Sequence, residues 1–252
     1  MHEFLYNPMN PAPTIGGRNL IWPAGPMEQS ELERRDDVLI YTSPILNESV
    51  AIAGEIKAHL WVSSSEKDTD FIVKLCDVYP NGKSYLIAEG ILMARHRISF
   101  EEEHFLEEGK VYELNISLGN IAITFNKGHK IRIMITSSSY PAYERNPNTG
   151  EAIRKNQTYN VARNRIYFGG KYDSYIEVPI VRKIEILPEN GIYLMGRKIF
   201  NANFLLAIGK INFEVDAKCE KVVFYLNGKR FMKMMRNHIH GVLMKELRGF
   251  TK

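Results

Sequence analysis

The sequence has little of what disulfide-rich scaffolds and membrane-spanning proteins require. Its 252 residues include only two cysteines, Cys76 and Cys219, and free cysteine usually behaves as a small buried apolar residue, so we expect no disulfide between them. No run approaches the roughly 18 consecutive apolar residues of a membrane span. The N-terminus also lacks the basic and then apolar pattern of a signal peptide. We therefore expect no membrane segment.

An excess of charge of one sign is missing as well. The 33 lysines and arginines stand against 29 acidic residues, which gives a net charge of +4 at pH 7. The densest basic stretch, residues 127–132, alternates with apolar residues and is typical of a solvated strand face. This balance favours no nucleic-acid partner. Hydrophobic residues at 44% and charged residues at 25% are ordinary for a globular protein.

Motifs of catalysis are absent or incomplete. A serine hydrolase of the α/β type needs G-x-S-x-G, because a sharp strand-to-helix turn must expose the nucleophile, and the sequence has no such motif. Ser64 to Lys67 fits S-x-x-K, but neither S-D-N nor K-T-G accompanies it. Gly16-Gly17 and Gly169-Gly170 lack the context of a phosphate-binding loop. The sequence therefore predicts no catalytic residue and no cofactor.

Metal ligands are equally poorly indicated. His238 and His240 alternate, but no HExxH or paired CxxC accompanies them. Asp68, Asp70 and Asp77 lack the glycine and the distal glutamate of a calcium loop, and carboxylates held by backbone amides are the better interpretation. We also interpret the glutamates at 101–103 and 107–108 as parts of solvated loops. The histidines at 96 and 129 are expected to be hydrogen-bonded structural residues.

What the sequence does have is strand periodicity between short polar turns. Residues 56, 58, 60 and 62 are apolar and alternate with Lys57, His59 and Trp61. The same pattern runs through 112–118 and 130–135, so we expect half-buried strands there. The first 35 residues are rich in proline and predict an irregular segment. Helical periodicity between the strands is missing, which disfavours a parallel α/β fold and favours an antiparallel sandwich, with a jelly roll as the leading candidate.

A linker around 182–191, with proline and glycine, separates two predicted domains. We place the first at residues 1–183 and the second at 184–252. In the second, residues 221–228 predict a strand that enters an Asn-Gly hairpin turn. This part resembles the first half of an immunoglobulin-like sandwich, although its length is short of the usual ~100 residues. The predicted fold class is therefore all-β, a jelly-roll (galactose-binding-like) sandwich followed by a small, incomplete immunoglobulin-like domain.

Seven segments, taken in order, resemble one known family. They are YNPMNPAPTIGG (6–17), RDDVLIYTS (35–43), DTDF (68–71), KLCDVYPNG (74–82), EGIL (89–92), SSSYPAYERNPNTG (137–150) and SYIEVPIV (174–181). This order resembles the C-terminal jelly-roll domain of the X-Pro dipeptidyl-peptidase and cocaine-esterase-like serine hydrolases. The resemblance covers residues 6 to about 181.

The resemblance implies an accessory role and one partner. In that family the jelly roll packs against an α/β-hydrolase domain whose Ser-Asp-His triad precedes this region, so no triad residue transfers to this chain. The loop after Gly17 approaches the acyl side of the substrate pocket in cocaine-esterase-like members, and the matching positions are Leu20, Ile21 and Trp22. The resemblance thus implies a peptidase or an esterase/amidase, and these three residues as substrate-binding. An apolar strand packing under the N-terminal segment is an equally open interpretation of the three.

Two other functions stay open from the residues alone. Jelly rolls also serve as carbohydrate-binding modules, and Tyr140, Tyr143, Tyr172 and Tyr175 are candidates for an aromatic platform. A structural or adhesive pair of sandwiches is the third possibility. The compartment and the oligomeric state are not indicated by the sequence.

Both ends of the sequence generate a prediction about the gene. The resemblance leads us to expect a catalytic domain before residue 1, and the loss of alternation after Arg230 suggests a shifted reading frame from about residue 233. Sequencing of the flanking DNA should show hydrolase-coding sequence upstream and a frame change near 233. A long upstream region without such coding, or a tail that is strand-like only in its present frame, would contradict these hypotheses.

Overall fold

A computed structural model describes residues 1–19, 23–155 and 158–181, together with the backbone of short strands between 191 and 246. The chain divides into two compact units, Met1–Ile180 and Val181–Lys252, and each is described by itself. Within these described parts, the helical elements are the single turns α1 (Ser30–Glu33) and η1 (Ala94–His96).

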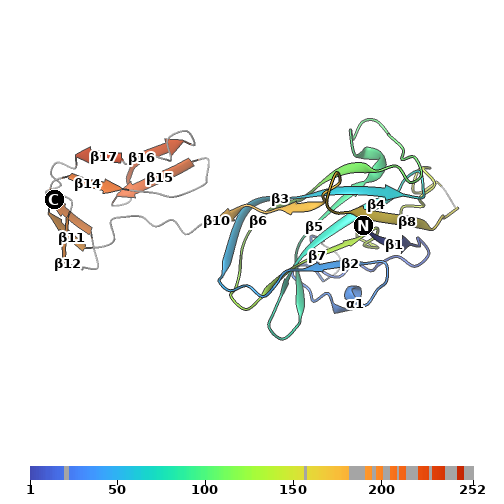
Figure 1. Cartoon of the computed structure of the whole chain (residues 1–252), viewed down its shortest axis with the longest axis horizontal. Coiled ribbons are helices and arrows are strands. Elements are labelled where there is room, and N and C mark those ends of the chain that lie inside the picture. The colour runs from blue at the N-terminus through green and yellow to red at the C-terminus, as the bar shows by residue number, and fades with distance from the viewer. Residues whose placement is uncertain are drawn as a thin grey trace. The chain divides into compact units, whose positions relative to one another are not determined.

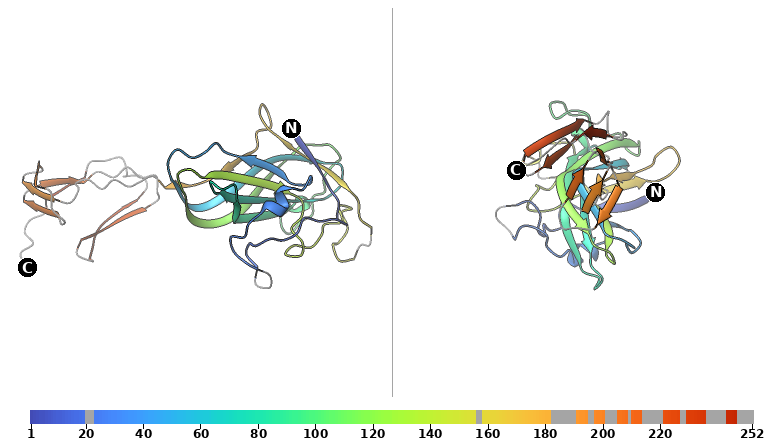
Figure 2. Two further views of the ribbon diagram at one scale, coloured as in Figure 1. Left: turned by 90° about the horizontal axis from the view of Figure 1, so that it is seen from below. Right: turned by 90° about the vertical axis from the view of Figure 1, so that its left-hand side faces the viewer.

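Two antiparallel sheets form the first unit (Figure 1). The six-stranded sheet consists of β1 (His2–Tyr6), β3 (Val50–Ser64), β6 (Tyr112–Phe125), β8 (Ala162–Tyr167), β9 (Tyr175–Glu177) and β10 (Ile180–Val181). The four-stranded sheet has the order β2 (Leu39–Thr42), β7 (Lys130–Thr136), β4 (Asp70–Val78), β5 (Ser84–Met93). The sheets stack as two layers with loops at their ends (Figure 2). The unit is therefore an all-β sandwich, and its jelly-roll connectivity stays a prediction.

The longest strand, β3, organises the six-stranded sheet. One of its edges pairs with β6 along nearly its whole length, from Val50 opposite Phe125 to Val62 opposite Tyr112. Its other edge pairs with β8 and β9. Residues 56, 58, 60 and 62 are buried, while Lys57 is exposed and Trp61 is half-buried, so the predicted alternation is confirmed. Strand β1, within the segment that we predicted to be irregular, pairs with β8.

A bulge in β6 changes which residues face the core. Up to Leu118 the even-numbered residues of β6 are turned inward, but from Gly119 onward the odd-numbered ones are, ending in the buried Phe125. The register shifts where Ile56 pairs with Gly119 and Lys57 pairs with Ser117. Gly119 has φ +85°, which favours glycine. The bulge therefore reverses which positions point inward, so that the apolar side chains in the second half of β6 still face the core.

The outer face of the four-stranded sheet is also partly covered: the first four residues of β7 are half-buried, as predicted, but Met134, on the polar side of the predicted alternation, is fully buried. Met134 of β7 and Cys76 of β4 form a second buried cluster with Leu86, Ala12 and Leu32. Leu32 comes from α1 in the N-terminal segment, which lies over this part of the outer face and buries the Met134 and Cys76 side chains there. A local alternation pattern cannot report a cover supplied from a distant part of the chain.

The described residues of the second unit form three small sheets. The first comprises β11 (Gly191–Leu194), β12 (Arg197–Phe200) and β13 (Leu205–Ile208), the second β14 (Lys210–Phe213) and β17 (Leu243–Glu246), and the third β15 (Lys221–Leu226) and β16 (Lys229–Met235). The antiparallel pairing of β15 with β16 confirms the predicted hairpin pairing. Strand β16 extends to Met235, so the first three residues of the tail from 233 lie in a strand, while 236–242 are outside the described residues.

A buried polar cluster ties one end of the sandwich together. The Asp68 carboxylate accepts hydrogen bonds from the Arg95 backbone amide at 2.9 Å and from Arg95 Nε at 2.8 Å. The side-chain amide of Asn146 donates to Asp68 at 2.7 Å and to Asp70 at 2.8 Å. Burial raises the pKa of Asp70 to about 7, against the lowering effect of the Asn146 hydrogen bond, and the neighbouring Asp68 charge raises it further.

The raised pKa of Asp70 predicts a pH-dependent stability. The folded-state pKa is above the unfolded value of about 3.9, so this group's stabilising contribution is complete below pH 4 and is lost as the pH rises through 7. Relative to an Asp70→Asn variant, the wild type should lose up to about 4 kcal/mol of unfolding free energy between pH 4 and pH 8. Urea unfolding at several pH values measures the difference. The control is Asp68→Asn, which should destabilise at pH 8 because it weakens the partner of the buried Arg95.

Candidate functional site

A pair of reciprocal hydrogen bonds closes a loop in the N-terminal segment. Gly17 and Gly25 each donate the backbone N–H to the other's carbonyl oxygen at 2.9 Å. Gly16, Gly17 and Gly25 have φ of +70°, +88° and +85°, a region in which residues with a Cβ are strained. We call these three residues the glycine clasp. It brings the two ends of the loop 18–24 together, so the position of that loop depends on where the clasp is fastened.

The clasp rests on a buried ion pair between two neighbouring strands, β4 and the edge strand β5. Lys74 and Glu89 lie opposite each other in the β4–β5 ladder, and Lys74 Nζ is 2.6 Å from Glu89 Oε2, with the side chains 1% and 4% exposed. Lys74 Nζ also lies 3.5 Å from Ser139 Oγ. A Cβ added to Gly17 would lie 2.3 Å from Glu89 Oε1. Glycine at 17 is therefore required by the carboxylate as well as by the backbone.

Arg18, the first residue of the loop, fastens the clasp to both sheets. Its Nη2 donates to the carbonyl oxygens of Glu89 in β5 and Leu118 in β6, each at 3.0 Å. These two strands are edge strands of different sheets, and edge carbonyls have no ladder partner on their free side. One guanidinium thus joins the edges of the two layers next to the glycine clasp.

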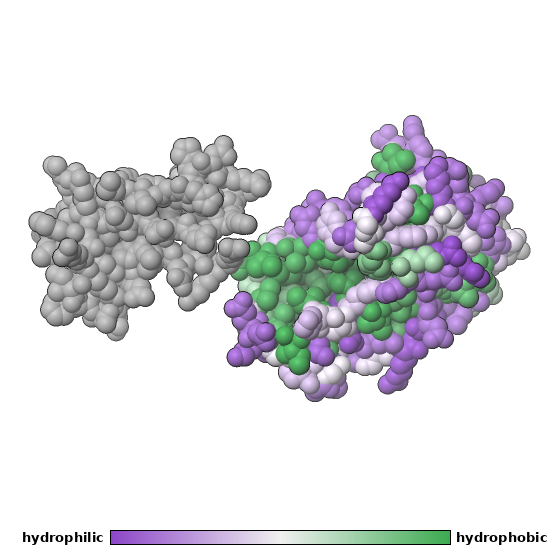
Figure 3. Space-filling model, viewed as in Figure 1, coloured by the Kyte–Doolittle hydropathy of each residue, from purple (hydrophilic) through white to green (hydrophobic). Residues whose placement is uncertain are grey.

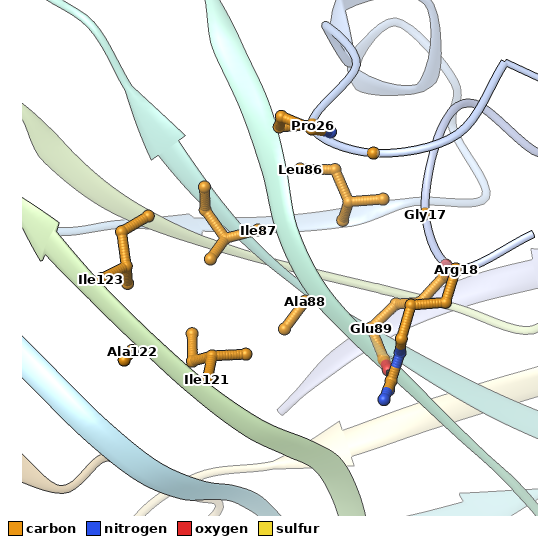
Figure 4. Close-up of a pocket in the computed structure, with 11 residues that line it drawn as sticks. Gly17, Arg18, Pro26, Leu86, Ile87, Ala88, Glu89, Ile121, Ala122 and Ile123 are labelled. Carbon is orange, nitrogen blue, oxygen red and sulfur yellow. Dashed lines mark hydrogen bonds between the residues drawn. The ribbon is translucent and has the colours of Figure 1, made fainter.

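An apolar groove of about 320 Å³ opens beside Arg18 (Figure 4). Its walls come from β5, β6 and the clasp, and its lining includes Leu86, Ile87, Ile121, Ile123 and Pro26. Figure 3 shows apolar surface exposed among hydrophilic side chains on one face of this unit. An open apolar groove that ends at a fixed cation suits contact with another surface or with an apolar group, rather than bond-making chemistry.

The electrostatics of the site agree with a positioning role. The charges of Glu89 and Arg18 act on Tyr143 in the loop after β7: burial raises the pKa of this tyrosine, Glu89 raises it further, and Arg18 opposes the rise. The Glu89 charge is balanced by Lys74 at 2.6 Å, so this carboxylate is engaged rather than available as a base. The arrangement can hold a loop in one place.

The three residues that the family resemblance indicated, Leu20, Ile21 and Trp22, lie outside the described residues. Their flanks are described, and they belong to the loop that the glycine clasp closes. The supporting residues Arg18, Lys74 and Glu89 were not predicted as a site. A signal existed, because Lys74 and Glu89 are lone charges within the apolar runs 71–76 and 86–92 of two consecutive strands.

Other residues considered from the sequence have structural partners. Asp77 accepts from His129, with His129 Nδ1 2.9 Å away, which confirms the expectation for this histidine. Asp68 is bound by a backbone amide, as expected, whereas Asp70 and Asp77 are bound by the side chains of Asn146 and His129. Among the residues that the structure describes, no three His, Cys, Asp or Glu side chains gather as metal ligands. In the same parts of the chain, no helix has the length and apolarity to cross a bilayer.

The four tyrosines divide between two regions, the segment 172–175 that leads into β9 and the loop after β7. Tyr172 contacts the Trp61 ring at 5.1 Å and Tyr175 stacks on His59 at 4.5 Å. Tyr140, by contrast, forms an isolated backbone β-bridge with Pro13, and the Arg145 guanidinium lies over its ring. Tyr143 follows in the same loop. The tyrosines therefore belong to two local clusters, each occupied with its own neighbours.

Comparison with known proteins gives a consistent family match. Residues 3–177 match the family described as the X-Pro dipeptidyl-peptidase C-terminal non-catalytic domain. Over 184 residues the chain is 38% identical to a cocaine esterase from Rhodococcus sp. (strain MB1 Bresler), covering 71% of this chain and 32% of that protein.

Solved structures agree. An aminopeptidase from the marine sediment archaeon Thaumarchaeota archaeon superimposes with a TM-score of 0.67 at 29% identity, covering 72% of this chain and 33% of that one. An α-amino acid ester hydrolase gives a TM-score of 0.67 at 29% identity, with 71% and 32% covered. The chain thus spans about a third of the length of these relatives.

Substitution of Gly17 tests whether the ion pair supports the clasp. We expect Gly17→Ala to lower the unfolding free energy by about 2 kcal/mol or more, because backbone strain adds to overlap with a carboxylate that Lys74 holds in place. Gly25→Ala is the matched control: its φ is similar, yet a Cβ there would meet nothing within 4 Å. Urea unfolding of both variants gives the difference, and equal losses would contradict the role assigned to Glu89.

Proposed function

The chain belongs to the family of X-Pro dipeptidyl-peptidase C-terminal non-catalytic domains, and from this premise we propose that it is the accessory β-sandwich of a serine hydrolase. In this proposal the sandwich packs on an α/β-hydrolase catalytic domain and helps to wall its substrate pocket. The catalytic triad comes from that domain, as an upstream part of the protein or as a separate chain. The single observation that carries the proposal is the family match over residues 3–177.

The lengths of the relatives support a partner of this kind. The matched region makes up only 32% of the Rhodococcus cocaine esterase and 33% of the archaeal aminopeptidase. In the family's own description this region is C-terminal and non-catalytic. A domain of this type therefore works beside a larger part that supplies the chemistry.

The loop 18–24 is our candidate for the pocket wall. We propose that Leu20, Ile21 and Trp22 contact the acyl side of the substrate. Support comes from the base of the loop, where the glycine clasp, Arg18 and the Lys74–Glu89 pair fix its two ends. Three consecutive apolar residues on such a base suit an apolar acyl group, because a pocket built on a fixed support loses less entropy on binding.

The proposed reaction is hydrolysis of an ester or of an amide, including a peptide bond after a penultimate proline. The named relatives include an esterase, an aminopeptidase and an amino acid ester hydrolase, all of which transfer an acyl group to water. An attacking serine and its oxyanion donors would belong to the catalytic domain. The sandwich would contribute shape and exclude water from the acyl side.

Reconstitution tests the accessory role. We expect purified 1–252 to hydrolyse neither a p-nitrophenyl ester nor an Xaa-Pro anilide by itself, and to raise the activity and thermal stability of the separately produced catalytic domain when added to it. Inhibitor-sensitive hydrolysis by 1–252 alone would refute the accessory role, as would a catalytic domain that is unaffected by its addition.

The pocket-wall residues are tested by a selective substitution in the reconstituted enzyme. Trp22→Ala should lower kcat/KM for an ester with an aromatic acyl group about tenfold, since a lost aromatic contact is worth one to two kcal/mol. An acetyl ester should be nearly unaffected because it is too small to reach the residue. Trp61→Ala, at the chain's other tryptophan, is the control. Equal effects on both esters would exclude a wall contact.

A further inference from the structure

The loop between η1 and β6 carries the most exposed large apolar side chains of the described residues. Phe100 is 84% exposed and Ile98 is 69% exposed. A small apolar group rises from hydrophilic surface at the upper edge of the first unit in Figure 3. Single exposed apolar residues are common, but two of them, separated by one residue in the same loop, can together fill an apolar pocket. We call residues 97–104 the Phe100 loop.

The Phe100 loop is held from below at both ends. Arg97 donates to the carbonyl oxygens of Ala94 and His104, and its guanidinium lies 4.3 Å from the centre of the Tyr112 ring. Arg95, which is bound to Asp68, also binds Glu103 at 2.9 Å. The arginines in these contacts are buried or half-buried, so the loop is already shaped before it meets a partner. A pre-organised anchor loses little entropy on binding.

The charged residues next to the apolar tip indicate which side chains a complementary surface would carry. Glu101 and Glu102 directly follow Phe100 and are exposed, with Glu102 Oε2 3.4 Å from His104 Nε2, whereas Glu103 is engaged with Arg95. The ring of His96 lies 6.4 Å from that of Phe100 and marks the inner side of the tip. A complementary surface therefore has an apolar pocket with lysine or arginine at its rim, since opposite charges at a rim speed and orient association.

We propose that the Phe100 loop is an anchor by which this domain docks on the hydrolase catalytic domain, with Phe100 and Ile98 in an apolar pocket that has a basic rim. The inference rests on the proposed function. The catalytic domain is the occupant because the relatives carry about two thirds of their length outside the matched region, and an exposed aromatic anchor on a fixed base is typical of the centre of an interface.

Binding of the separately produced catalytic domain to 1–252 tests the anchor. We expect Phe100→Ser and Ile98→Ser to weaken the dissociation constant by about 10- to 100-fold, as anchor residues of an interface do. Because both side chains are exposed, the Tm of 1–252 should shift by no more than about 2 °C. The control is Ile45→Ser, at a 59% exposed apolar residue in the loop between β2 and β3, which should bind like the wild type.

Charge reversal tests the basic rim. Glu101→Lys together with Glu102→Lys should slow association about tenfold at low salt, and the effect should fade as salt is raised. The exposed Glu48→Lys serves as the control for net charge. An effect that is independent of salt would overturn the assignment of a basic rim.

The outcomes separate the anchor from the accessory role. If the wild type fails to bind any catalytic domain, the proposed function fails, and the anchor with it. If the wild type binds and the Phe100→Ser variant binds equally well, the anchor alone is refuted. If sedimentation shows that 1–252 self-associates and that Phe100→Ser abolishes this, the occupant is a second copy, which also overturns the proposal.

Discussion

The cross-strand ion pair of Lys74 and Glu89 is the contact on which the arrangement of the first unit depends. Two charges can be taken out of water only where geometry and surrounding hydrogen bonds compensate them. Here the pair lies on the outer face of the four-stranded sheet, so a cover is necessary, and the N-terminal segment supplies it. The same segment carries Leu32 into the second apolar cluster and Gly17 onto the carboxylate. Loss of either charge would leave the other buried and unpaired.

The cover connects stability to function in the proposed hydrolase. In this proposal Lys74 and Glu89 act through the loop rather than on the substrate: they support the glycine clasp, and the clasp joins the two ends of the loop 18–24. Arg18 adds to this support, because it donates hydrogen bonds to backbone carbonyl oxygens of both edge strands. A buried pair of this kind contributes more to a defined position than to net stability, because its desolvation cost offsets most of the attraction.

The parts of the fold set by local periodicity were predictable. The buried positions of β3 follow from simple alternation, and Asn-Gly between two apolar runs indicated the β15–β16 pairing. Positions that depend on distant residues were not predictable. Strand β7 alternates like a half-buried strand, yet Met134 is buried because Leu32 and Ala12, more than 100 residues earlier, cover it. Likewise, Leu20, Ile21 and Trp22 were indicated by family resemblance alone. The residues Arg18, Lys74 and Glu89 come together only in the folded structure, where the edges of the two sheets meet.

The bulge at Gly119 has a consequence for how sequences of this domain are compared. Strand β6 consists of two stretches joined at one residue. The side chains that face the core are even-numbered in the first stretch and odd-numbered in the second. An insertion or deletion of a single codon within either stretch would turn the apolar side chains beyond it toward water, whereas a change at the junction only moves the point of reversal. When relatives are aligned through this strand, length differences should therefore collect at the glycine, and the parity of the apolar columns should reverse there.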